Sequence, residues 1–202
     1  MMLRSLFGPS QSEILQELAD DIVAEYVPGS FFRGAKLIQK YKNWRLLLDT
    51  YTVHTGQVSI MKTRVRVPFV NPGSFRFTLH NKNIFNRLYE FLGGNHLPTG
   101  DPRLNERFII KSNRPEMILD LLESDLLREK ILLQPAFVLH VNEERSWFKS
   151  DFPPEVTQLC YQAESVLKDP EQLRNILLLL AMLLERMVQI GLIPETDPEV
   201  SL

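Results

Sequence analysis

The chain has 202 residues, of which 44% are hydrophobic and 24% charged, and its formal net charge is −2. These values are close to the average of globular proteins and argue against a disordered or fibrous chain. The length favours a single domain over residues 1–202. The single cysteine, Cys160, excludes an internal disulfide and a multi-cysteine zinc site.

The N-terminus contains Arg4 but lacks the apolar stretch of about 7 to 15 residues that a secretory signal needs. The strongest apolar run, residues 176–184, would rise only about 14 Å as a helix, whereas the hydrocarbon layer of a membrane is about 30 Å thick. We therefore expect a buried helix at this position, no transmembrane segment and a cytoplasmic location.

The first expected helix begins behind Ser10 and Glu13, which form a capping-box pattern, and ends at Pro28-Gly29. The hydrophobic period then changes to two, which is typical of strands with one buried face. Four segments show this pattern: residues 35–41, 44–54, 58–69 and 74–80. Because the turns between them are short, they predict a four-stranded antiparallel meander.

A short helix is expected over residues 83–92, and the Gly- and Pro-rich loop at 93–102 is the best candidate for a seam between subdomains. Residues 156–167 are left open between strand and helix, although their alternation favours a strand. The remaining expected elements are a strand at 107–111, a helix capped by Asn113, helical turns at 125–132, a hairpin of 136–141 with 145–150, and a long helix at 169–191 capped by Asp169.

This order of elements predicts an α+β fold. Its sheet should be mainly antiparallel, with about seven strands in one sheet or in two sub-sheets. The sheet is expected to pack against the N-terminal helix and the long C-terminal helix. The expected core includes residues from several strands: Leu46, Leu48, Val65, Phe75, Phe77, Phe108 and Ile110.

Residues 99–122 combine a Gly-Asp pair, an Arg-Phe-hydrophobic strand, a polar turn with proline and a Leu-Leu helix. The segment resembles one found in uncharacterised bacterial domains. The matching positions are Gly100, Asp101, Phe108, Ile110, Pro115, Leu121 and Leu122. Leu104 and Asn105 stand where the pattern has Phe-Asp. The resemblance implies a structural signature, a strand entering a sheet and a helix leaving it, and carries no biochemical role.

No catalytic residue, metal site or cofactor is predicted. The four histidines, His54, His80, His96 and His140, are too far apart in the sequence for a metal-binding pair on one helix. Cys160 lies in an apolar stretch and is expected to be an inert thiol. Asp101 is expected to fasten its loop by binding backbone amides. Asp49 is expected to pair with an arginine on a neighbouring strand.

The charges are segregated along the chain. Residues 31–80 contain nine basic residues and one acidic residue, a net charge of +8, whereas residues 1–30 and 81–202 carry −4 and −6. Period two places Lys62, Arg64 and Arg66 on one strand face, and Arg76 and His80 are expected to extend that face on the next strand. The five residues predict a sheet face for an acidic protein segment or another anionic ligand.

The sequence therefore predicts a non-enzymatic binding domain. Nucleic acid is disfavoured as the partner because the isoelectric point is about 6.1 and no nucleic-acid motif is present. One alternative is a small enzyme that holds a phosphorylated or carboxylated molecule with Arg64 and Arg66 while His80 or Asp49 moves a proton. Another is a homo-oligomer subunit that uses exposed leucines of the 169–191 helix. The basic face could also simply be neutralised within the fold.

Overall fold

The computed structural model describes residues 9–30, 34–56, 58–83, 96–142 and 152–200. These residues form one eight-stranded sheet with all neighbours antiparallel, in the order β1-β2-β3-β4-β8-β7-β5-β6. The strands are β1 (Glu25–Val27), β2 (Lys36–Tyr41), β3 (Trp44–Thr55), β4 (Val58–Val70), β5 (Phe77–Asn81), β6 (Phe108–Ser112), β7 (Phe137–Asn142) and β8 (Val156–Ala163).

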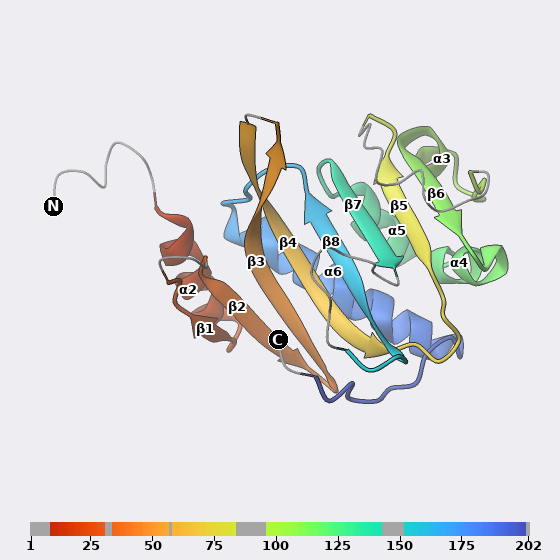
Figure 1. The fold of residues 1–202 in the computed structure, drawn as a ribbon. Coiled ribbons are helices and arrows are strands. Elements are labelled where there is room, and N and C mark those ends of the chain that lie inside the picture. Colours follow the sequence, from red (N-terminus) through yellow and green to blue (C-terminus); the bar gives the residue numbers. More distant parts are fainter. Residues whose placement is uncertain (1–8, 31–33, 57, 84–95, 143–151, 201–202) are drawn as a thin grey trace, which may run out of the picture.

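The described helices all lie on one side of this sheet, with α6 crossing behind its central strands (Figure 1). They are α2 (Gln11–Asp21), α3 (Pro102–Arg107), α4 (Pro115–Leu122), α5 (Asp125–Leu132) and α6 (Pro170–Gln189). The predicted α+β fold is confirmed, as is the strand favoured over residues 156–167. The expected helix at 83–92, apart from residue 83, and the expected strand at 145–150 lie outside the described residues.

The prediction of a four-stranded meander is wrong, because β5 does not follow β4 in the sheet. The second neighbour of β4 is β8, and β5 lies between β7 and β6. The side chain of Asn71 bonds the backbone N–H and C=O of Phe75, at 3.0 and 2.9 Å, and holds this connection in a loop. Six residues can span up to about 20 Å, enough for the roughly 14 Å across three strand spacings.

Alternation along the strands directs apolar side chains toward the helices, as predicted. The seven expected core residues are all buried, with exposed fractions of 1% or less. Burying each such side chain stabilises the fold by about 1.5–3 kcal/mol. The leucines of α6 mostly enter this core, while Leu178 is 44% exposed. No described helix combines the length and apolar character needed to span a membrane.

The first and last described helices begin at their predicted caps. Ser10 and Glu13 form both bonds of the capping box, and Asp169 accepts a bond from the Glu171 amide at 3.0 Å. Asn113, in contrast, does not cap α4, whose N-cap is Arg114. The Asn113 side chain accepts a hydrogen bond from the Arg76 amide at 2.7 Å and donates one to the Ser74 carbonyl at 2.8 Å. It therefore joins the connection before β5 to the end of β6.

The 99–122 segment contains a helix, α3, that the sequence pattern did not reveal. Asp101 caps it by accepting from the Arg103 amide at 2.8 Å, which confirms its expected bonding to backbone amides. Its carboxylate also pairs with the Arg103 and Arg128 guanidiniums. Asn105 bonds the amide and carbonyl of Thr99, each at 2.7 Å. Both side chains therefore stabilise the turn that starts α3.

Replacing Asp101 with alanine is expected to lower the free energy of unfolding by about 1 kcal/mol, the usual value of an N-cap. The hydrogen bond from the Arg103 side chain lowers the pKa of Asp101. Its contribution is therefore present at neutral pH and is lost as the pH falls through that lowered pKa. Urea denaturation at pH 7 measures the effect. The exposed Glu106 of the same helix serves as the control, because Glu106→Ala should change stability by less than about 0.5 kcal/mol.

Candidate binding face of the sheet

The predicted basic residues of β4 lie on the side of the sheet opposite the described helices, which we call the helix-free face. Residues paired directly across antiparallel strands point to the same side of a sheet. One such row crosses all eight strands: Glu25, Ile38, Leu47, Arg66, Cys160, His140, Thr78 and Lys111. Residues from the N-terminal and the C-terminal half of the chain therefore share one surface.

The structure brings together only part of the predicted site. Lys62, Arg64 and Arg66 lie along β4 and face the same side, as the period of two predicted. Arg76 precedes β5, and His80 lies in it. Because β8 and β7 separate β4 from β5, the expectation that these two residues extend the patch on an adjacent strand is wrong. Three strand spacings, about 14 Å, separate them from β4.

Asp49 joins two of the three β4 residues in an ion cluster. The Arg64 guanidinium donates two hydrogen bonds to its carboxylate, at 2.9 and 2.8 Å, and Arg66 donates a third at 2.7 Å. The predicted pairing of Asp49 with a neighbouring-strand arginine is thus confirmed. One carboxylate between two guanidiniums leaves a net charge of +1. The Asp49 side chain is only 8% exposed, so the cluster is mostly removed from water.

Two further contacts involve the β4 residues Arg64 and Lys62. Arg64 stacks on the ring of Tyr51 at 4.8 Å, and burial raises the pKa of Tyr51 to about 12, so its hydroxyl is neutral. Lys62 is paired with Glu164 at 2.7 Å. Its charge is therefore neutralised within the fold, and Lys62 contributes little to attraction of an external anion.

Burial also removes charge from the β5–β7 part of the face. His80 and His140 are 8% and 7% exposed. Burial lowers the pKa of both histidines, that of His140 to about 4. Both rings are consequently neutral near pH 7. His80, which was predicted as a member of the basic face, therefore adds no positive charge there.

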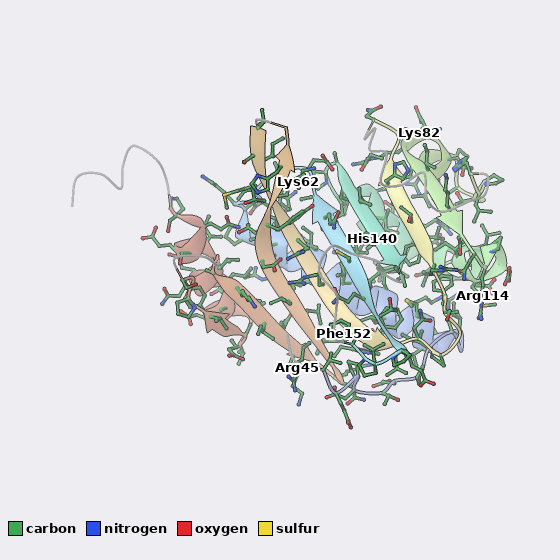
Figure 2. The ribbon with its side chains drawn as sticks, in the orientation of Figure 1. Arg45, Lys62, Lys82, Arg114, His140 and Phe152 are labelled. Atoms are coloured by element: carbon green, nitrogen blue, oxygen red, sulfur yellow. The ribbon has the colours of Figure 1, made fainter. Side chains whose placement is uncertain are left out.

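Exposed positive charge is found instead on β2 and at the start of β3. Lys36, Lys40 and Arg45 point to the helix-free face, and we call them the basic strip. Lys40 and Arg45 are exposed and stand directly opposite each other. No described carboxylate forms an ion pair with any of the three. Figure 2 shows Arg45 and Lys62 toward opposite ends of the β3–β4 pair.

Sequence reasoning counted these three residues in the basic segment but did not select them as a site. The signal was present, because the period of two in residues 35–41 and 44–54 places them on one strand face. The sequence could not show that Lys62 pairs with Glu164, which is 102 residues away. Because that pairing neutralises Lys62, the positive charge available to a ligand lies at the basic strip and not in the middle of β4.

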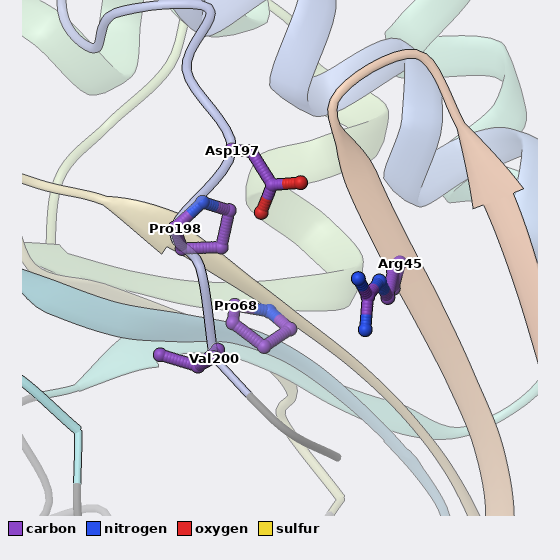
Figure 3. Close-up of a pocket in the computed structure, with 5 residues that line it drawn as sticks. All are labelled: Arg45, Pro68, Asp197, Pro198 and Val200. Carbon is purple, nitrogen blue, oxygen red and sulfur yellow. The ribbon is translucent and has the colours of Figure 1, made fainter.

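The described geometry does not assemble the groups of the enzyme alternative. Asp49 is held by two arginines, and His80 lies three strands away from them. The hollow formed by Arg45, Pro68, Asp197, Pro198 and Val200 (Figure 3) has a volume of about 10 Å³. That is room for about one water molecule, whereas small-molecule sites usually exceed about 300 Å³. In the described part of the chain, no three metal-ligating side chains are grouped to hold an ion.

Comparisons with known proteins show that this chain is similar in fold to a solved structure. No protein-family model and no curated protein matches the chain. Among solved structures, the crystal structure of the mycobacterial trehalose monomycolate transport factor A, TtfA, is similar, with a TM-score of 0.55 and 10% sequence identity. The match covers 91% of this chain and 96% of TtfA. The two chains share a fold. At this identity the comparison transfers neither residues nor activity.

Proposed function

We propose that this chain is a non-catalytic binding protein that holds an acidic segment of another protein on its helix-free face, at the basic strip. The observation that carries the proposal is the placement of Lys40 directly opposite Arg45 without a described carboxylate partner. Like charges in this position destabilise a sheet. A bound carboxylate between them relieves that repulsion. The net positive Arg64–Asp49–Arg66 cluster lies beside the strip and adds to the attraction.

The shape of the site favours an extended segment over a small anion. Lys36 and Lys40 are four residues apart on one strand, which separates their Cα atoms by about 13 Å. A single phosphate or carboxylate cannot bridge that distance, whereas several carboxylates along an extended chain can. A nucleic acid fits less well because the chain as a whole is acidic, with a net charge of −2.

A binding role is compatible with the fold, which this chain shares with a mycobacterial transport factor. The geometry therefore supports recognition by surface charge. No specific observation favours the enzyme alternative.

The proposal is tested by reversing the charge of the basic strip with the double variant Lys40→Glu/Arg45→Glu. Binding of a fluorescently labelled octaglutamate peptide is followed by anisotropy at 50 mM NaCl. We expect the affinity to fall at least about tenfold, because each 1.4 kcal/mol of lost attraction corresponds to a factor of ten. Raising the salt to 200 mM should weaken the binding of the wild-type chain, since ions screen exposed charges.

The matched control carries the same change in charge away from the basic strip, Lys82→Glu/Lys168→Glu, because both lysines are exposed and neither lies on β2 or β3. Circular dichroism verifies that each variant is folded. The proposal is overturned if the control weakens binding as much as the strip variant, or if the wild-type chain does not bind the peptide. Arg64 and Arg66 are unsuitable for this test, because reversing them would bring three carboxylates together around Asp49.

A further inference from the structure

The C-terminal segment, residues 194–200, runs onto the end of the helix-free face where Arg45 lies. After α6, the chain is anchored by Leu192 and Ile193, which are 7% and 4% exposed. It then passes the turn between β2 and β3, where the Asn43 side chain donates a hydrogen bond to the Glu195 carbonyl at 3.0 Å. The segment, which we call the acidic tail, ends beside the face (Figure 1).

The contact between the tail and the face combines apolar packing with opposite charge. Pro198 and Val200 are half-buried beside Pro68, while Asp197 and Glu199 are exposed. Asp197 and Arg45 border the same hollow (Figure 3). The tail carries three carboxylates and no basic residue. An acidic segment, with Thr196 and Pro198 between its carboxylates, therefore lies beside Arg45 at one end of the strip.

A local hydrogen bond shapes the tail at this point. The carboxylate of Asp197 accepts from the Glu199 amide at 2.8 Å, and Glu199 has a φ of +52°. For a non-glycine residue, this left-handed conformation is unfavourable. The contacts of the tail with the sheet must offset that cost.

We infer that the acidic tail occupies the basic strip in cis and competes there with the acidic partner segment. The inference rests on the proposed function for the identity of the partner. A short tether gives the tail an effective concentration in the millimolar range. The partner then binds only the fraction of molecules whose tail has left the strip, so its apparent affinity is reduced by that fraction. The tail also indicates the partner's chemistry: carboxylates at every second residue, separated by residues such as threonine and proline.

The test neutralises the tail in the full chain with the variant Glu195→Gln/Asp197→Asn/Glu199→Gln. We expect the labelled octaglutamate peptide to bind this variant about three- to tenfold more tightly than wild type at 50 mM NaCl, with the difference shrinking at 300 mM as screening increases. The control neutralises three exposed carboxylates on helices, Glu106→Gln/Glu116→Gln/Glu171→Gln, which makes the same change in net charge. The control should improve binding by less than the tail variant.

A second measurement follows the tail without any peptide. In NMR spectra, the backbone amide signals of Asp197, Glu199 and Val200 should shift in the Lys40→Glu/Arg45→Glu variant, because the charge beside Asp197 changes from positive to negative. If the peptide binds wild type and the tail variant equally, the inference is overturned while the proposed function stands. If neither protein binds the peptide, the proposed function fails, and competition at the strip fails with it. Unchanged tail signals in the strip variant also overturn the inference.

Discussion

Replacing Asp49 with alanine is expected to lower the free energy of unfolding by about 2–4 kcal/mol. The change leaves the Arg64 and Arg66 guanidiniums side by side with no carboxylate between them, and removal of one partner from a buried ion pair costs about 3–5 kcal/mol. We expect a smaller loss than for a fully buried pair, because the two arginine side chains are 21% and 24% exposed and water can partly solvate them. Urea denaturation at pH 7, followed by circular dichroism, measures the difference.

A matched apolar replacement tests whether the loss comes from the unpaired charges. The triple variant Asp49→Leu/Arg64→Met/Arg66→Met removes all three ions, and burying apolar groups in place of an ion cluster is often neutral or stabilising. It should therefore be more stable than Asp49→Ala. The exposed Asp20 provides the surface control, with a change below about 0.5 kcal/mol. A triple variant less stable than the single one would contradict this account of the cluster.

The stability of the chain is expected to fall between pH 7 and pH 4 because His140 is buried in its neutral form. Burial lowers the pKa of His140 from 6.5 to about 4. Between these values the unfolded state binds a proton that the folded state does not, so stability decreases as the pH falls. The full shift corresponds to at most about 3.5 kcal/mol, since each pKa unit is worth about 1.4 kcal/mol. Above pH 6.5 this contribution is constant.

The variant His140→Gln isolates this contribution. Its free energy of unfolding, measured in urea at pH 7, 5.5 and 4.5, should decline less than that of wild type, whatever its absolute stability. Addition of His80→Gln should flatten the decline further, because burial lowers the pKa of His80 as well. His54 is exposed, and His54→Gln should leave the decline unchanged. Equal declines for wild type and His140→Gln would show that His140 is not the group responsible.

Local features of the sequence were sufficient to predict most of the elements. A period of two in the strands correctly separated Thr63 and Val65 from Arg64 and Arg66, because alternate side chains of a strand always point to opposite faces. Ser10 and Asp169 marked the beginnings of two helices, since an N-cap depends on residues only three positions apart. Even the pairing of Asp49 was predictable, because a short turn joins its strand to β4 and an isolated acid faces several basic residues there.

The tertiary structure alone decided which strands are neighbours and which charges remain available. Short local turns could not reveal that the connection from β4 to β5 passes the ends of β8 and β7, because strand order depends on how distant apolar faces pack together. The pairing of Lys62 with Glu164 is likewise a contact between segments far apart in the chain. The sequence by itself determined a basic sheet face. Long-range packing determined that its accessible charge lies at Lys40 and Arg45, the second of which borders the same hollow as Asp197.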